Sequence, residues 1–296
     1  MARTRLRGLE IGGVQIGIEV PESYEWEWPD GPVAEFQCLP REPEVHVGLR
    51  VAEVASEDLG GECYAIGPWT FEVARVGSDW RLGLSVGGRR AQLASFDRDF
   101  EAGEVTVCRE MAAQRAYPLR GPLDEWIVLH RTVARGGLCL AGSAMARDGQ
   151  AIVRLGATGS RATEGWSSPA TSLLGRNAVL VREVRGQLRL FRTPWSRSLD
   201  AALGFEAPVC EFEKIEEAEH AYVDLLDASH AAERLVTHAI VPLCDDRLLD
   251  RVLRNARCIG RGSRVIERGE SAASGAPMAW RSPQLQGAFA PPRGGL

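Results

Sequence analysis

Apolar and polar side chains alternate with a period of two along the first part of the chain, up to about residue 115. This is the pattern of half-buried β-strands. The clearest runs are residues 14–20, 45–51, 70–76 and 104–108. Residues 80–86 and 89–96 form a further pair, and the Gly87-Gly88 dipeptide between them is typical of a tight hairpin turn. The pattern predicts a β-rich N-terminal domain over residues 1–116.

The spacing of apolar residues changes after Pro122, where a helix can begin. Apolar positions then recur at the intervals of an amphipathic helix, and His130 falls on its apolar face, which favours a core histidine over a catalytic one. Further strands are predicted at 138–140, 150–155 and in a hairpin over 180–191, and further helices near 217–225, 229–239 and 245–258. The sequence therefore predicts a mixed α/β (α+β) chain with a second domain at 117–270. Residues 271–296, rich in Ala, Gly, Pro and Ser, predict a disordered tail.

Charge and composition narrow the function classes. The formal net charge is −5 and no segment is a basic block, so nucleic-acid binding has no electrostatic signature. No apolar run approaches the ~20 residues of a membrane span, and the N-terminus lacks the apolar core of a signal peptide, which favours a cytoplasmic protein without a membrane partner. The seven cysteines and five histidines show no metal-ligand spacing, so no metal is expected.

The most informative segment follows the strand-like run 151–155, where a Walker A loop, G-x-x-x-x-G-K-[ST], would be expected. The residues that define this degenerate nucleotide loop are Gly156, Gly159, Arg161, Ala162 and Thr163. The first glycine and the final threonine fit the motif, but arginine stands at the second glycine and alanine at the lysine. The only lysine of the chain, Lys214, lies in an acidic stretch, so the sequence places no lysine near the loop.

The order of these features resembles the C-terminal domain of HPr kinase/phosphorylase and related serine kinases over residues 119–260. The motifs that carry the resemblance are Pro122-Leu123-Asp124-Glu125-Trp126, Leu138-Cys139-Leu140-Ala141-Gly142-Ser143, Asp148-Gly149-Gln150, Leu173-Leu174-Gly175-Arg176-Asn177-Ala178-Val179, Arg192-Thr193-Pro194-Trp195-Ser196 and Ala207-Pro208-Val209. The resemblance implies a P-loop kinase fold that binds ATP and Mg²⁺ and acts on serines of small proteins or peptides. It also makes a homo-oligomer one expectation.

The departures from that family are concentrated in its chemistry. Ala141 stands where the family has a histidine, and Arg176-Asn177 stands where it has paired aspartates for metal and base roles. Phosphoryl transfer needs charge neutralisation, metal and base together. Loss of all three predicts a pseudokinase: a non-catalytic protein without a cofactor, which acts as a scaffold for a protein or peptide partner.

Two segments are candidate partner surfaces, each with a structural alternative. Trp26 and Trp28 lie in an aromatic, acidic loop, which is either anchored by tryptophan packing or used as an interface. Thr193-Pro194-Trp195 is either a structural turn or part of a residual substrate surface.

Alternatives of other classes stay open at this stage. One is an ATP-binding serine kinase with relocated contacts, in which Arg161, Arg176 and Thr163 reach the phosphates. Another is an unrelated enzyme or structural subunit, although no Ser/His/Asp order points to a hydrolase. Two smaller expectations are that Trp166 fills the vacated nucleotide pocket and that four glutamates form a solvated face: Glu211, Glu213, Glu216 and Glu217.

Overall fold

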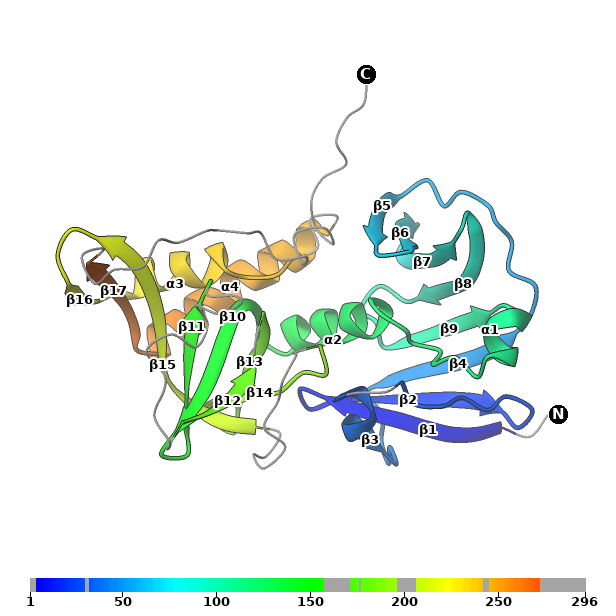
Figure 1. The fold of residues 1–296 in the computed structure, drawn as a ribbon, viewed down its shortest axis with the longest axis horizontal. Helices are drawn as coiled ribbons and strands as arrows, with labels where there is room; N and C mark the ends of the chain where they lie inside the picture. Colours follow the sequence, from blue (N-terminus) through cyan, green and yellow to red (C-terminus); the bar gives the residue numbers. More distant parts are fainter. Residues whose placement is uncertain are drawn as a thin grey trace, which may run out of the picture. The chain divides into compact units, whose positions relative to one another are not determined.

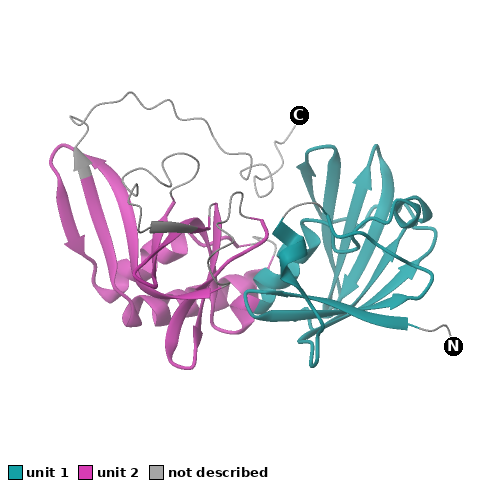
Figure 2. Ribbon diagram, turned by 60° about the horizontal axis from the view of Figure 1, so that its bottom comes forward, with its two compact units in different colours: residues 1–131, 284–296 teal, residues 132–283 magenta. Residues whose placement is uncertain are grey.

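The protein has a mixed α+β fold with large β-sheets and few helices (Figure 1). The computed structural model describes residues 4–29, 32–156, 171–175, 177–195, 206–241 and 245–271. The chain divides into two compact units, with the boundary between Arg131 and Thr132 (Figure 2). The domain boundary predicted from the sequence, at residue 116, precedes the amphipathic helix. In the structure most of that helix belongs to unit 1, so the boundary between the units lies later in the chain.

Unit 1 is built on a nine-stranded sheet in the order β3-β1-β2-β4-β9-β8-β7-β6-β5. The strands are β1 (Thr4–Ile11), β2 (Val14–Pro21), β3 (Gln37–Cys38), β4 (Val45–Val51), β5 (Glu62–Ile66), β6 (Trp69–Val76), β7 (Asp79–Val86), β8 (Arg89–Phe96) and β9 (Ala102–Val107). The helical elements are the 3₁₀ turn η1 (Pro32–Phe36), α1 (Arg109–Ala113) and α2 (Leu123–Ala134). The pairs β2–β4 and β4–β9 are parallel, and the other pairs are antiparallel.

The core of unit 1 forms where α2 packs on the sheet through aromatic rings. The ring of His130 stacks on Phe100 at a centroid distance of 4.3 Å and on Trp126 at 5.4 Å, and it meets the edge of Trp80 at 5.6 Å. Its Nδ1–H donates to the carbonyl of Trp126 at 2.8 Å. His130 is therefore a buried packing residue, because its ring is enclosed by three aromatic side chains.

In the described part of unit 2, ten elements follow the end of α2. They are β10 (Leu138–Arg147), β11 (Gln150–Leu155), β12 (Thr171–Gly175), β13 (Ala178–Val184), β14 (Gln187–Phe191), β15 (Glu206–Ala218), β16 (Tyr222–Leu225), α3 (Ala228–Thr237), α4 (Asp246–Gly262) and β17 (Val265–Ser271). The sheet order is β11-β10-β13-β14-β15-β17-β16, with β12 paired to β10. An additional pairing of β11 with β15 joins the two ends of the first five strands into a closed ring.

Two long strands make this closure possible, because each pairs with different neighbours along its length. β10 pairs with β13 through residues 138–141 and with β11 through residues 142–147. β15 pairs with β14 at its start, then in parallel with β11, and finally in parallel with β17. As a result β11 has strand partners on both sides, and its carboxyl end lies beside parallel strand β15.

Helices α3 and α4 pack against each other through small side chains. A Cβ atom on Gly260 would lie 3.0 Å from the backbone nitrogen of Ala232, so the glycine permits the close approach. Asp227 caps α3 by accepting from the N–H groups of Ser229 and His230. The Nδ2 of Asn255 donates to the carbonyls of Val133 and Gly137, which ties α4 to the segment leading into β10.

Most local predictions agree with these elements. The strand runs of unit 1, the helix after Pro122, the hairpins and the last two helices are all present. The helix predicted near residues 217–225 is wrong, because β15 extends to Ala218 and β16 begins at Tyr222. The predicted tail lies outside the described residues except for Ser271. Among the described residues, no helix is both long enough and apolar enough to cross a membrane.

Candidate functional site

The site predicted at the end of β11 is a hydrogen-bonded junction centred on Gly156. This residue has φ +69°, and its N–H donates to the carbonyl of Ala141 at 2.8 Å. A Cβ atom at this position would lie 2.7 Å from Cε1 of His238. Glycine is thus required here both by the left-handed backbone and by the imidazole that packs against it.

His238 reaches the junction because the segment after α3 joins the edge of β10. The N–H of Ala141 donates to the carbonyl of His238 at 2.7 Å, and the N–H of Ile240 donates to the carbonyl of Cys139 at 2.8 Å. Ala141 therefore holds Gly156 through its carbonyl and His238 through its amide. Its backbone carries this role, so a residue without a functional side chain suffices.

Two other predicted residues lie at the same end of β10. The carbonyl of Asn177 accepts from the N–H of Gly142 at 3.1 Å, and Asn177 has φ +70°, a conformation that asparagine tolerates better than most residues. The hydroxyl of Thr193 donates to the carbonyl of Ala178 at 3.5 Å. Thr193 and Pro194 are buried and Trp195 is half-buried, so this turn offers mainly the tryptophan to solvent.

The imidazole of His238 is held neutral at physiological pH. Burial, followed by the positive charges of Lys214 and Arg234, lowers the pKa of His238 to about 4. Its Nε2 is enclosed and has no hydrogen-bond partner among the described residues. The ring is thus a weak base with one unused polar atom.

The prediction that the only lysine of the chain, Lys214, lies away from the loop is wrong. In the parallel register of β11 and β15, Lys214 is the partner of Leu155, the residue directly before Gly156. Paired residues of neighbouring strands project to the same face of a sheet, and the charge of Lys214 acts on His238. A lysine therefore lies at this strand end, and it is supplied by β15 rather than by the segment that follows β11.

The opposite face of β11 and β15 carries a buried ion-pair cluster. Nε and Nη2 of Arg154 donate to Oε2 of Glu213 at 3.1 and 3.0 Å, and Nε of Arg268 lies 3.0 Å from Oε1. The side chains of Arg154 and Glu213 are 6% and 5% exposed. The expectation of a solvated face is thus wrong for Glu213, whose carboxylate instead fixes the β11–β15 register.

The other positions that the sequence analysis singled out near this site lie outside the described residues. These are Gly159, Arg161, Ala162, Thr163, Arg176 and Trp166. Within the part of the chain that the structure describes, no three His, Cys, Asp or Glu side chains converge as ligands for a metal ion. The described junction consists of backbone hydrogen bonds, a neutral imidazole and one ammonium group.

Neither the scan of protein-family models nor the search of curated proteins gives a match for this chain.

The aromatic loop of unit 1 is pinned to its surroundings. Trp26 is 4% exposed, and the guanidinium of Arg7 lies 4.0 Å from its ring centroid. Trp28 is half-buried, and its ring packs in a tilted arrangement against Tyr117 at a centroid distance of 5.5 Å; the hydroxyl of Tyr117 is itself buried. The hydroxyl of Tyr24 donates to the carbonyl of Ala116 at 2.5 Å. Tryptophan packing anchors this loop, which leaves Trp28 as its more accessible ring.

Sequence reasoning found the glycine of this site but missed His238 and Lys214. Neither residue has a local signal: His238 follows a helix as an isolated histidine, and Lys214 stands among glutamates. Both reach Gly156 only through pairings between segments that are distant in the chain.

Proposed function

We propose that this chain is a non-catalytic binding protein, built on an HPr-kinase-like domain, whose partner is a protein or peptide. The order of β10, β11, the β13–β14 hairpin and the following helices supports the resemblance. The strand that precedes the loop ends at Leu155, directly before Gly156, beside a parallel strand, and ligands of α/β sheets bind at such carboxyl ends.

The main support for the proposal is the lack of catalytic side chains among the described residues around Gly156. Ala141 supplies no side-chain acid or base, and Asn177 supplies an amide where the family has a carboxylate. His238 has a pKa of about 4, whereas a general base works best with a pKa near the operating pH. The described residues at this strand end therefore lack the base and the carboxylates that phosphoryl transfer requires.

One observation favours a second candidate function, in which the same strand end binds a phosphate group or a nucleotide without transferring it. Lys214 is in register with Leu155, and its ammonium has no ion pair with any residue that the structure describes. A lysine acts on a phosphate as a point charge, and this does not depend on which strand supplies it. Lys214 could thus replace the charge lost at Ala162.

Calorimetry with ATP and ADP, with and without Mg²⁺, tests the proposal together with a phosphotransfer assay on a serine peptide. The proposal expects no heat of binding at millimolar nucleotide and no transfer. Mg²⁺-dependent phosphotransfer would overturn it. Nucleotide binding without transfer would support the second function, provided that Lys214→Met abolishes it and the matched exposed variant Arg254→Met does not.

A further inference from the structure

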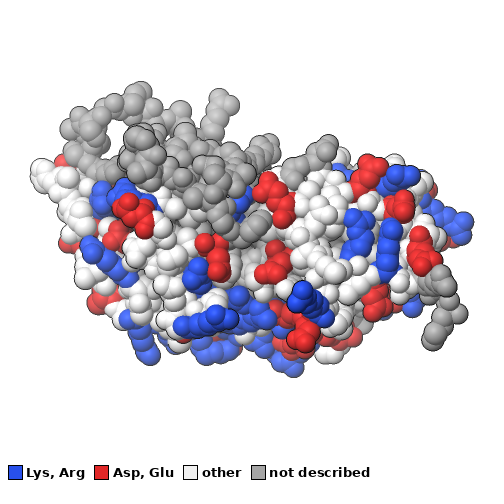
Figure 3. Space-filling model, turned by 90° about the horizontal axis from the view of Figure 1, so that it is seen from below, with Lys and Arg blue, Asp and Glu red and all other residues white. Residues whose placement is uncertain are grey.

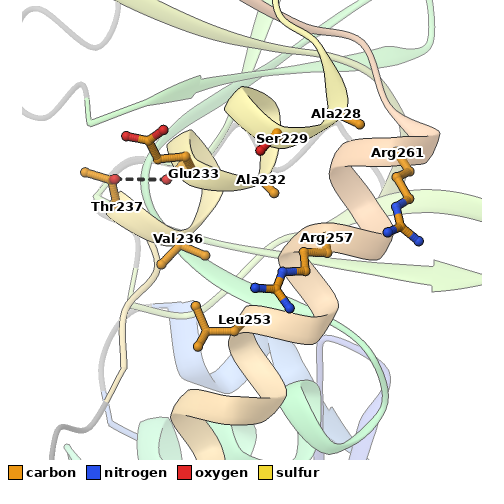
Figure 4. A pocket seen from close by; sticks show the side chains of 9 residues that line it. All are labelled: Ala228, Ser229, Ala232, Glu233, Val236, Thr237, Leu253, Arg257 and Arg261. Atoms are coloured by element: carbon orange, nitrogen blue, oxygen red, sulfur yellow. Dashed lines mark hydrogen bonds between the residues drawn. The ribbon is translucent and has the colours of Figure 1, made fainter.

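Helices α3 and α4 enclose a groove of about 530 Å³ on unit 2, and none of the residues of the Gly156 junction lines it (Figure 4). Its wall on α4 carries Arg257 and Arg261, and its wall on α3 carries Glu233. The other lining side chains are small or apolar: Ala228, Ser229, Ala232, Val236, Thr237 and Leu253. Figure 4 shows both arginine side chains extending from the same side of α4.

Two nearby arginines of unit 2 have acidic partners, whereas the two arginines of the groove have none among the described residues. Arg234 lies 2.7 Å from Glu267, and Arg264 lies 2.8 Å from Glu211. Arg257 and Arg261, by contrast, make no hydrogen bond or ion pair with the described part of the chain. They are one helical turn apart, so their backbone origins are separated by about 6 Å along the axis. The groove thus presents two adjacent guanidinium groups that are free to bind carboxylates.

We infer that this groove binds an acidic peptide segment of a partner protein, with two carboxylates one helical turn apart facing α4. A guanidinium binds a carboxylate through paired hydrogen bonds. The apolar floor formed by Ala232, Val236 and Leu253 accepts an aliphatic side chain between the acids. The proposal names a partner chemistry that fits the proposed binding role, but it does not rest on the kinase resemblance.

Other occupants match the groove less well. Residues 272–296 contain Arg281 and Arg293 and no acidic residue, so their charge repeats that of the α4 wall. A nucleic acid would place phosphates against both walls, and Glu233 on the α3 wall opposes this. Figure 3 shows side chains of both charge signs on one face of the protein. An acidic peptide, by contrast, places its carboxylates only against the α4 wall, which carries the two arginines.

The test uses the full chain and fluorescence polarisation. The probe is a short fluorescein-labelled helical peptide with two glutamates four positions apart and a leucine between them. Its matched control peptide has glutamine at both acidic positions. We expect saturable binding of the acidic peptide, weaker at about 200 mM than at about 50 mM salt, because exposed charges are screened.

Three variants locate the binding. Arg257→Gln/Arg261→Gln should weaken binding on the order of tenfold, since two charge-assisted contacts are lost. Ser229→Phe should also weaken it, because a large ring fills the groove without changing its charge. Arg254→Gln, on the same helix but outside the groove, should have no effect. Thermal unfolding monitors that each variant stays folded.

The proposal is overturned if the glutamine peptide binds equally well, if Arg254→Gln weakens binding as much as the double variant, or if no binding is detected. Binding of a single-stranded oligonucleotide in preference to the acidic peptide would also overturn it. None of these results depends on nucleotide binding at Gly156, so failure here and failure of the proposed function are distinguishable.

Discussion

The pH dependence of unfolding should reveal the neutral imidazole of His238. The folded-state pKa is about 4 and the ordinary value is 6.5, so protons bind the unfolded chain more readily between these two values. The contribution of His238 to stability is therefore complete above about pH 6.5 and is lost progressively as the pH falls towards 4. In the His238→Asn variant the imidazole is absent, so this loss of stability at low pH is removed.

The magnitude follows from the difference between the two pKa values. A difference of about 2.5 corresponds to about 3 kcal/mol, at 1.36 kcal/mol for each pKa unit. The imidazole is only half-buried, so solvent screening reduces the expected effect to about 1–2 kcal/mol.

Urea unfolding at pH 7.5 and pH 4.5 measures this difference. The free energy of unfolding of the wild type should fall by about 1–2 kcal/mol more than that of His238→Asn. Carboxylates titrate in both proteins and cancel in the comparison. The matched control is His220→Asn, an exposed histidine of the same unit, which should behave as the wild type. Equal pH dependence in the wild type and His238→Asn would refute the reasoning, as would an NMR titration of His238 near pH 6.5.

Two further predictions concern the packing around β11. Gly156→Ala should lower the free energy of unfolding by about 2 kcal/mol, because it combines positive φ with a clash against His238. Gly186→Ala is the matched control, because Gly186 has φ +77° but open space around it, so an alanine there adds backbone strain without a clash. Its free energy of unfolding, measured in urea, should fall less than that of Gly156→Ala. Equal losses would contradict the contribution of the clash with His238. Glu213→Gln should cost about 3–5 kcal/mol, since it leaves Arg154 buried without its carboxylate. Arg154→Met should lower the free energy of unfolding less than Glu213→Gln does, because Arg268 remains paired with Glu213. A larger loss for Arg154→Met in thermal or urea unfolding would show that this cluster is not the main restraint on the β11–β15 register.

The sequence predicted local elements well where a repeating pattern or a turn residue was present. The turns at Gly87-Gly88, Asp148-Gly149 and Arg185-Gly186 have positive φ at both positions, as tight hairpin turns of this type require. The alternating pattern likewise predicted the first and last residues of β4 correctly. These features depend on neighbours within a few residues, so the sequence contains them directly.

The sequence failed where partners are distant. The helix predicted near residues 217–225 covers the end of β15 and all of β16. The expected solvated face is wrong at Glu213, whose carboxylate is neutralised by arginines from two other strands. Lys214 was placed away from the nucleotide loop for the same reason. Its position beside Gly156 depends on the β11–β15 register, and no local pattern specifies a parallel pairing of that kind.

The closed ring of strands in unit 2 also sets the order in which the site can form during synthesis. Arg154 and Glu213 are 59 residues apart in the chain, so β11 leaves the ribosome well before its parallel partner. Until β15 is made, one edge of β11 stays open, and Gly156 has neither Lys214 nor His238 beside it. Closure over such a separation is entropically slow. The site should thus be among the last parts of unit 2 to assemble, and a nascent chain that stalls before residue 218 would expose an unpaired strand edge to its neighbours.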